Sequence, residues 1–312
     1  MKDQGLARIF RAIAAFIFLS SNPSNLASLL ATEIAIAAHG TLVIYVPTNN
    51  GLIVAADSRA SVGPTLHCDD TDKIVPLRKH SRTVVVVGGY DTITMGRGKP
   101  PADPCKYRKT HPPTVTFSSL ARDFLDAQSG DIGEKNLRSL ETAVLNKLDA
   151  LRAQYPKLKI SDPDGGPVLT LTLASYDAEA HVPIFGEFSV CGDSSTVGHF
   201  FVCHRDWIRI AQTDAASLKR LGDVGCLDTK ALTTRGRQLL GPQFLKEFDY
   251  FMNHSRTVSQ ITNKEALAVA VDLISSAERM ADLTSDAPCT FIGGPIRAVL
   301  LDESHATPFK LQ

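Results

Sequence analysis

A run of five residues at positions 83–87, Thr-Val-Val-Val-Val, constrains the fold more than any other segment of the chain. β-branched side chains favour strands, and an unbroken run of them predicts a strand that is buried on both faces. A Gly-Gly pair ends this strand, which forms a hairpin with residues 74–77. An earlier hairpin joins residues 41–46 to residues 52–56 across a turn that ends in Asn-Gly, a pair that favours tight turns between strands.

Helical and strand patterns then come in blocks rather than in strict alternation. Helical periodicity covers residues 118–127, 136–155, 230–252 and 264–280. Strand patterns lie at residues 168–176, 182–190, 199–203, 207–212 and 296–301. Block order of this kind favours an α+β fold, and we expect a four-layer αββα sandwich of two antiparallel sheets flanked by helices.

No strong linker interrupts this pattern. Residues 96–114 hold five prolines and several charges, which predicts a long loop inside the fold. We therefore expect one domain over residues 41–305, followed by a short C-terminal tail at residues 306–312.

The composition excludes several classes of function. The chain has 33 basic and 33 acidic residues among 312, and 44% of its residues are hydrophobic. Disordered chains are poorer in apolar residues, and proteins that bind nucleic acid usually carry a basic excess. The sequence also has no glycine-rich phosphate loop and no G-x-G-x-x-G or G-x-S-x-G motif. We expect no nucleic-acid partner and no cofactor.

The first forty residues have the features of an export signal. Lys2, Arg8 and Arg11 precede an apolar run at residues 12–19, and small residues follow. The run is too short to span a bilayer, which needs about 20 residues. We expect residues 1–40 to be a signal peptide and propeptide, so that the protein is periplasmic or secreted and keeps no stable membrane anchor. The alternative is an N-terminal helix of the fold in a cytoplasmic protein.

Two sites in this segment fit cleavage after small residues. A cut after the Ala-Ile-Ala sequence at positions 35–37 would leave Ala38 as the first residue. A cut between Gly40 and Thr41, by signal peptidase or by the protein itself, would leave Thr41 first.

Six cysteines stand at positions 68, 105, 191, 203, 226 and 289. An even number in an exported protein predicts at least one disulfide, although the sequence leaves the pairing open. The sequence His67-Cys68-Asp69-Asp70 offers possible metal ligands. Residues this close in sequence rarely all reach one ion, so we expect a polar loop near a pocket and no metal.

Residues beside the two hairpins suit hydrolytic chemistry. A threonine hydroxyl needs a base, and the α-amine freed by a cut before Thr41 can be that base, with a reference pKa of about 7.7–8.0. A Lys73 ammonium nearby would lower that pKa, and Asp57 would hold Lys73 charged and aimed. The backbone N–H of Gly88 could form an oxyanion hole, because glycine lets the chain approach a substrate closely. Each residue alone has an ordinary structural explanation, and only the combination points to catalysis.

This stretch resembles the catalytic β-type subunits of the proteasome, which are N-terminal nucleophile hydrolases. The matching segments are Gly-Thr at 40–41, Gly-Leu-Ile-Val-Ala-Ala-Asp-Ser-Arg-Ala at 51–60, Asp-Lys-Ile at 72–74 and Val-Gly-Gly at 87–89. Gly-Gly-Pro-Ile at 293–296, with the helix before it, looks like the family's last helix and strand. The resemblance implies the αββα fold, a threonine peptidase activity and maturation by cleavage before Thr41.

The resemblance also implies a role for each matching residue. Thr41 would be nucleophile and base, Asp57 and Lys73 the supporting charge pair, and Gly88 the oxyanion donor. Arg59 would have a structural role in its turn. The family's substrate pocket would map onto four small or uncharged residues, which are Ala60, Thr71, Val75 and Val86. We therefore expect cleavage after small or apolar residues of the substrate. A homo-oligomeric ring is a further implied feature.

The chain departs from the family in places. Leu42 replaces a second threonine that members often have, and the segment at 96–114 looks inserted. The family's additional Ser and Asp near the threonine have no clean match here. Candidates from later segments are Ser189, Gly192, Asp193, Ser194, Ser195, Asp282, Ser285 and Asp286.

Two other functions stay open. The protein could cleave a non-peptide amide, or it could keep the fold without catalysis as a ring or binding protein. Activity on acyl amides alone would favour the first, and an uncut bond before Thr41 the second. An exported enzyme has no ATP-driven unfoldase beside it, so we expect peptides, unfolded chains or small amides as substrates.

Overall fold

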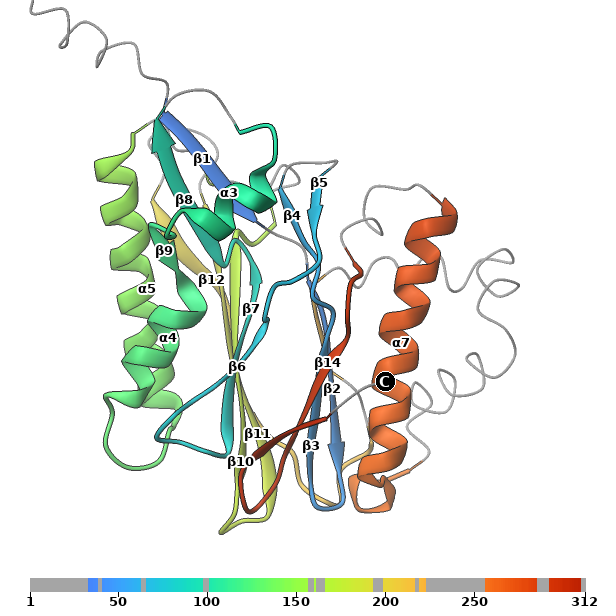
Figure 1. Cartoon of the computed structure of the whole chain (residues 1–312). Coiled ribbons are helices and arrows are strands. Elements are labelled where there is room, and N and C mark those ends of the chain that lie inside the picture. Colours follow the sequence, from blue (N-terminus) through green and yellow to red (C-terminus); the bar gives the residue numbers. More distant parts are fainter. Residues whose placement is uncertain are drawn as a thin grey trace, which may run out of the picture.

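The computed structural model describes residues 33–38, 41–62, 66–97, 101–156, 160, 166–192, 199–216, 219–222, 256–284 and 292–309. Within these residues, two five-stranded antiparallel sheets form the centre of the protein (Figure 1). The first has the order β13-β2-β3-β14-β15, with β13 (Lys219–Gly222), β2 (Leu42–Thr48), β3 (Gly51–Ala56), β14 (Arg297–Leu301) and β15 (Ala306–Phe309). The second has the order β12-β11-β10-β7-β6, with β12 (Phe200–Arg209), β11 (Val182–Gly192), β10 (Leu169–Asp177), β7 (Thr83–Gly89) and β6 (Ile74–Pro76).

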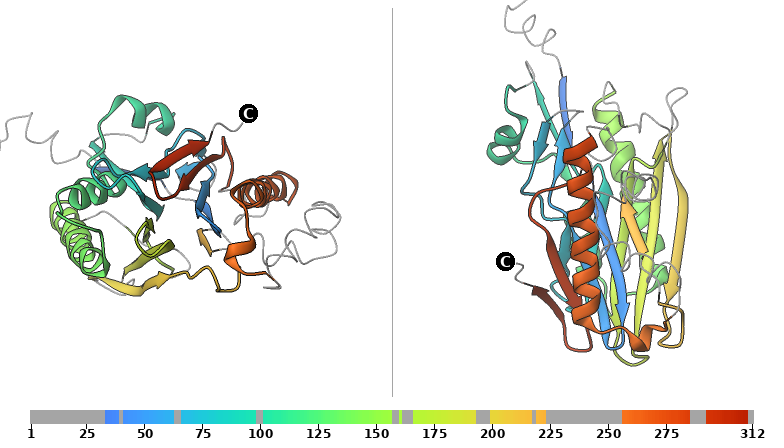
Figure 2. Two further views of the ribbon diagram at one scale, coloured as in Figure 1. Left: turned by 90° about the horizontal axis from the view of Figure 1, so that it is seen from below. Right: turned by 90° about the vertical axis from the view of Figure 1, so that its right-hand side faces the viewer.

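Helices cover the outer faces of the two sheets. The helices α4 (Phe117–Asp126) and α5 (Glu134–Gln154) lie on the second sheet, and α7 (Asn263–Thr284) lies on the first (Figures 1 and 2). The view from below in Figure 2 shows the sheets between the two groups of helices. This arrangement confirms the α+β class and is compatible with the predicted sandwich.

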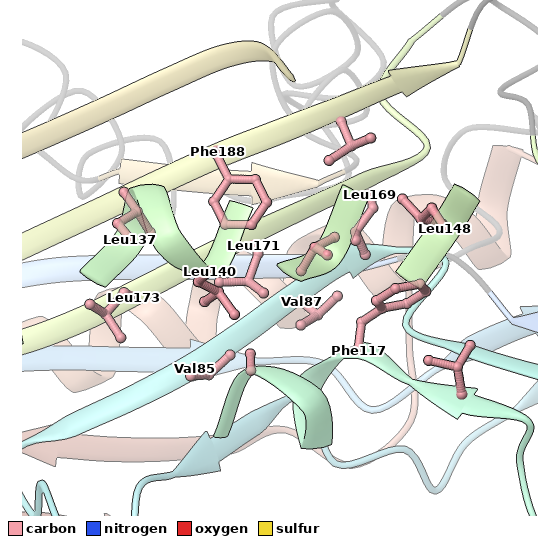
Figure 3. Close-up of a cluster of buried hydrophobic side chains, with 14 of the residues drawn as sticks. Val85, Val87, Phe117, Leu137, Leu140, Leu148, Leu169, Leu171, Leu173 and Phe188 are labelled. Carbon is pink, nitrogen blue, oxygen red and sulfur yellow. The ribbon is translucent and has the colours of Figure 1, made fainter. Parts of the chain in front are cut away.

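The predicted burial of the β-branched strand on both faces is confirmed. Val84 and Val86 join the apolar cluster between the two sheets, where they meet β2 and β3 side chains such as Tyr45. Val85 and Val87 point the other way, into the cluster beneath α4 and α5 (Figure 3). The same alternation occurs in β2 and β3, because a strand places successive side chains on opposite faces and here both faces are covered.

A smaller set of elements lies at one end of the sandwich (Figure 1). The strands β1 (Glu33–Ala38), β8 (Thr92–Arg97) and β9 (Val115–Thr116) form a three-stranded sheet with β8 in the middle. Strand β1 thus lies inside the segment that we expected to be removed. The short strands β4 (Ala60–Val62) and β5 (Leu66–Cys68) pair with each other nearby.

The proline-rich segment is not a simple loop. It contains α3 (Pro104–Thr110), whose N-cap is Asp103 and whose first residue is proline, a residue that suits the first turn of a helix. Other differences concern boundaries: residues 199–212 were expected as two strands, but the structure has one strand, β12, there. Residues 306–309, expected in a tail, form the edge strand β15. The predicted helix at 230–252 lies outside the described residues.

The expectation of at least one disulfide is confirmed. Cys68 pairs with Cys105, and Cys191 pairs with Cys203. Cys226 and Cys289 lie outside the described residues. None of the helices in the described part of the chain has the length and apolar character needed to cross a membrane.

Candidate active site

The hairpin of β2 and β3 brings Thr41 and Asp57 together. Thr41 directly precedes β2, Asp57 directly follows β3, and both are buried. The backbone N–H of Asp57 donates to the Leu42 carbonyl at 3.2 Å, and the Leu42 N–H donates to Asp57 Oδ1 at 2.8 Å. The Asp57 carboxylate therefore binds the peptide group that links Thr41 to Leu42.

Lys73 reaches the same carboxylate from the other sheet. It directly precedes β6, and its Nζ lies 2.6 Å from Asp57 Oδ1. The side chains are 3% exposed for Lys73 and 0% for Asp57. Burial lowers the pKa of the Lys73 ammonium below its usual value, whereas the adjacent Asp57 charge opposes that shift.

The second oxygen of Asp57 also has donors. Oδ2 accepts hydrogen bonds from Gly293 N at 3.1 Å and from Arg59 N at 3.2 Å. The carboxylate thus collects donors from β2, from its own turn, from Lys73 and from the loop that leads into β14. Hydrogen bonds from two sheets and a loop fix its orientation.

Arg59 links this turn to two neighbouring segments. Its guanidinium forms two hydrogen bonds with Asp69, from Nε at 2.8 Å and from Nη2 at 3.1 Å, and Nη1 donates to the Ile292 carbonyl at 3.0 Å. The hydrogen bond from Arg59 lowers the pKa of Asp69. Gly293 has φ +152°, and a Cβ there would lie 2.5 Å from Arg59 Cζ, so the position requires glycine.

Gly88 lies on β7 at the level of the charge pair. Ile74, the residue after Lys73, pairs with Val86, and Gly88 stands two residues further along the same strand. On its other side Gly88 pairs with Thr170 of β10. Gly88 and Lys73 therefore lie at the same end of the second sheet.

The expected substrate-pocket residues separate into two groups. Thr71 and Val75 line a cavity of about 490 Å³, whereas Ala60 and Val86 are buried outside its lining. Val86 belongs to the cluster between the sheets. Ala60 pairs with Cys68, which does line the cavity.

Sequence reasoning missed the charged part of this cavity. Asp91, Arg108 and Arg122 line it together with Asp70 and Asp72. The available signal was the basic sequence Lys-Tyr-Arg-Lys at 106–109, which we interpreted as part of a loop. A segment that is expected to be a loop has no predictable position in the fold, so the sequence could not place these side chains beside Thr71.

The later Ser and Asp candidates are only partly described. Ser189 lies on β11 and shares a hydrogen bond of 2.8 Å with the Thr170 hydroxyl, beside the Thr170–Gly88 pair. Gly192 ends β11. Asp282 lies in α7. The others lie outside the described residues; they are Asp193, Ser194, Ser195, Ser285 and Asp286. Gly40 and His39 also lie outside them.

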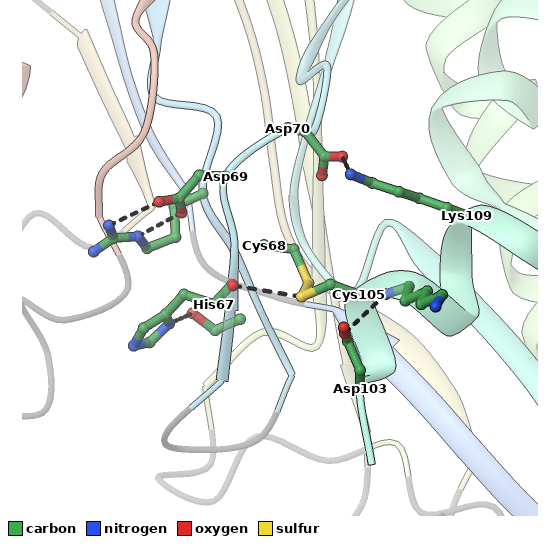
Figure 4. Close-up of a disulfide and its surroundings, with 10 residues drawn as sticks. His67, Cys68, Asp69, Asp70, Asp103, Cys105 and Lys109 are labelled. Carbon is green, nitrogen blue, oxygen red and sulfur yellow. Dashed lines mark hydrogen bonds and ion pairs between the residues drawn. A yellow bond between two sulfur atoms is a disulfide. The ribbon is translucent and has the colours of Figure 1, made fainter. Parts of the chain in front are cut away.

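The residues of the possible metal motif have other partners. Cys68 is in a disulfide, Asp69 binds Arg59, Asp70 pairs with Lys109 at 2.7 Å, and His67 Nδ1 lies 2.9 Å from Ser61 Oγ (Figure 4). In the described ranges, no three His, Cys, Asp or Glu side chains group in a way that could hold a metal ion.

Comparison with known proteins adds no family to this site. No protein-family model matches the chain, and no curated protein is similar to it.

Proposed function

We propose that the protein is a threonine-type N-terminal nucleophile hydrolase whose active chain begins at Thr41. One observation carries the proposal: Asp57 Oδ1 accepts hydrogen bonds from both the Lys73 ammonium and the amide that follows Thr41. Burial of an ion pair costs desolvation free energy, and a pair on the surface would not have that cost. The burial of Asp57 and Lys73 therefore favours a role beyond stability. The pair lies beside the peptide bond that follows Thr41, and this position supports a role in activating an N-terminal threonine.

The proposed reaction begins with the free α-amine of Thr41. The amine takes the hydroxyl proton of the same residue, and the Thr41 oxygen attacks the carbonyl carbon of an amide bond. The resulting ammonium returns the proton to the leaving nitrogen, the C–N bond breaks, and an ester to Thr41 remains. The amine then takes a proton from water, the hydroxide attacks the ester, and the acid leaves as Thr41 regains its hydrogen.

Lys73 and Gly88 support these steps. The Lys73 ammonium and the Leu42 N–H both donate to Asp57 Oδ1, at 2.6 Å and 2.8 Å. In the proposed mechanism, the positive charge of Lys73 would favour the neutral form of an amine at Thr41. An amine with a lower pKa is neutral in more molecules near pH 7 and can act as a base. The Gly88 N–H is the proposed donor to the oxyanion, and this hydrogen bond would stabilise the negative charge that develops in the transition state.

The proposed substrates are peptides or unfolded chains, cut after small or apolar residues without ATP. Thr71 and Val75 are the two expected pocket residues that line the cavity, and both are uncharged. The two disulfides support export of the protein, because disulfides persist in oxidising compartments. Assembly into a homo-oligomeric ring stays part of the proposal, and it is tested by the mass of the native particle.

A non-peptide amide is the second candidate substrate. The cavity of about 490 Å³ has the size of a small-molecule site, for which about 300–1,000 Å³ is usual. Cleavage of acyl amides by a preparation that leaves peptides intact would identify this case.

The test combines N-terminal sequencing with covalent labelling. We expect the purified protein to begin at Thr41 and to be labelled there by an electrophile that reacts with N-terminal threonine. Thr41→Ser should keep labelling and hydrolysis, and Thr41→Ala should lose both. A chain that begins at Ala38 or His39 and resists the label would contradict the proposal and favour a non-catalytic protein.

A further inference from the structure

The cavity beside Thr71 is built largely by the segment around α3. Its lining comes from the β5–β6 region, β8, α3 and the start of α4. The Cys68–Cys105 disulfide joins α3 to β5, and both cysteines line the cavity (Figure 4). This covalent link holds α3 next to the segment between β5 and β6, which contains Thr71.

Most charges in the cavity wall have a partner. Lys109 pairs with Asp70 at 2.7 Å, as Figure 4 shows. The other two ion pairs join a residue of the wall to one outside it, at 2.9 Å and 3.2 Å; they are Asp72–Arg297 and Arg122–Asp123.

Asp91 is also held by its neighbours. Its carboxylate accepts hydrogen bonds from Ser118 N at 2.7 Å and Ser118 Oγ at 3.0 Å, at the beginning of α4. Burial raises the pKa of Asp91, so this carboxyl group carries its charge at a cost. It is therefore a poor counterion for a cation across the cavity.

Arg108 is the exception among these residues. In the described part of the chain, its buried Nε has no hydrogen-bond partner, and its guanidinium forms no ion pair within 4.0 Å. Burial lowers the pKa of Arg108, while the more distant charges of Asp70 and Asp91 oppose the shift. A guanidinium that has lost part of its hydration without gaining a bidentate partner is stabilised when an anion binds.

Two hydroxyls of the same wall are in a similar state. Thr71 Oγ1 and Thr94 Oγ1 are buried and lack a hydrogen-bond partner among the described residues, and Thr94 is only 2% exposed. Each can donate one hydrogen bond to an acceptor. Buried polar groups in folded proteins are nearly always satisfied, so Arg108 Nε and the two hydroxyls favour a ligand with acceptor oxygens at this cavity.

We propose that this cavity binds a ligand through its carboxylate group, with Arg108 as the residue that selects the negative charge. The planar guanidinium matches the two oxygens of a carboxylate, and the threonine hydroxyls supply additional donors. The wall also contains Asp70, Asp72 and Asp91, which would repel a doubly charged phosphate more strongly than a singly charged carboxylate. The volume of about 490 Å³ accepts a group of amino-acid size, either free or as part of a peptide.

This inference goes beyond the proposed hydrolase, because it concerns binding alone. Ala60 and Val86 lie outside the cavity lining, so a small residue at the cut bond and a carboxylate in the cavity can belong to different parts of one substrate. A protein that lacks hydrolase activity would still bind the carboxylate.

The experiment is calorimetric titration of the folded, disulfide-bonded protein with N-acetylglutamate α-amide, whose only carboxylate is on the side chain. N-acetylglutamine α-amide, which has the same shape without the charge, is the matched probe, and inorganic phosphate is the third. We expect N-acetylglutamate α-amide to bind about tenfold or more tightly than either of the others, because a charge-assisted hydrogen bond contributes that much. A blocked tripeptide with a central glutamate then shows whether a peptide binds more tightly than the free acid.

Variants on α3 identify the residue responsible. Arg108→Met should weaken the binding of N-acetylglutamate α-amide about tenfold or more, and Arg108→Lys should give an intermediate affinity. Lys106→Met removes one positive charge from the exposed surface of the same helix, outside the cavity lining, and should bind like the wild type. Equal binding of the two α-amides, tighter binding of phosphate, no binding at all, or full affinity in Arg108→Met would each overturn the inference. The comparison of probes on the wild type decides the question even where Arg108→Met does not fold.

Discussion

Asp57 and Lys73 come from opposite sheets, and Asp57 Oδ1 lies 2.6 Å from Lys73 Nζ with both side chains almost completely withdrawn from solvent. In the sequence, the β4–β5 pair lies between them. Their contact therefore depends on the packing of one sheet against the other. Stability and activity are both expected to depend on this pair.

Removal of one partner should destabilise the protein strongly. Lys73→Met leaves the Asp57 carboxylate buried without its cation, which typically costs about 3–5 kcal/mol. Urea unfolding followed by circular dichroism measures this loss. Arg138→Met is the control, because Arg138 forms an exposed pair with Glu134 one helical turn away, and such pairs contribute less than about 1 kcal/mol. Similar losses in the two variants would contradict the assigned importance of the buried pair.

The pH dependence of stability follows from the lowered pKa of Lys73. In the unfolded chain Lys73 keeps its proton up to about the usual lysine pKa of 10.5, whereas in the folded protein it loses the proton at a lower pH. Between these two values the unfolded state binds more protons, so this group makes the free energy of unfolding rise with pH in that window. Urea unfolding from neutral to alkaline pH should show that rise, and Lys73→Met should lack it. A wild-type curve that falls throughout this window with the same slope as the variant would contradict the shift.

The same titration should limit catalysis at alkaline pH. Loss of the Lys73 proton removes the positive charge that favours a neutral, basic amine at Thr41, and it weakens the orientation of Asp57. We expect kcat/KM to decline on the alkaline side below pH 10.5, the usual lysine value. The pH profile of hydrolysis measures the midpoint of this decline. A profile that stays flat up to the lysine value would show that Lys73 has no such role.

Gly293 should tolerate substitution much less than Gly130. Both have positive φ, but a Cβ at Gly293 would lie 2.5 Å from Arg59 Cζ, whereas no described atom lies within 4 Å of a Cβ at Gly130. Gly130→Ala should therefore cost only the backbone strain of about 1–2 kcal/mol. Gly293→Ala should cost more, and it should also weaken the hydrogen bond from Gly293 N to Asp57. Chemical denaturation of both variants, together with the hydrolysis rate, tests this difference.

Reduction of the Cys68–Cys105 disulfide should release α3 from β5. The bond joins residues 37 positions apart, and its loss should lower the free energy of unfolding by about 2–4 kcal/mol. We also expect weaker binding of N-acetylglutamate α-amide, because Arg108 lies on the released helix. The paired substitution Cys68→Ser with Cys105→Ser tests both effects. The matched control replaces Cys191 and Cys203, which are 12 positions apart on the β11–β12 pair and should leave the binding unchanged.

Local patterns predicted the strands and helices that bury apolar side chains. The run at 83–87 could be recognised as doubly buried because β-branched residues without polar alternation have few other uses. Asp57 and Lys73 could be selected as a pair from chemistry and from resemblance to a family, and the structure brings them together. The helix α3 was missed because prolines dominate its surroundings, although Pro104 occupies the one helical turn in which proline is favourable.

The charged cavity could not be predicted for a different reason. Its wall combines residues from β5, β6, β8, α3 and α4, and their proximity depends on the Cys68–Cys105 bond. The sequence allows fifteen pairings of six cysteines, so it could not bring Arg108 to Thr71. Local propensity determines single elements, whereas a cavity between elements depends on how they pack.

Because Asp57 and Lys73 belong to different sheets, their contact can form only after both sheets have formed. A half-folded chain in which one sheet has formed and the other has not holds only one member of the couple. If the protein is the proposed hydrolase, such a chain lacks the charge pair that supports the nucleophile, and the active site forms only when the two sheets pack together.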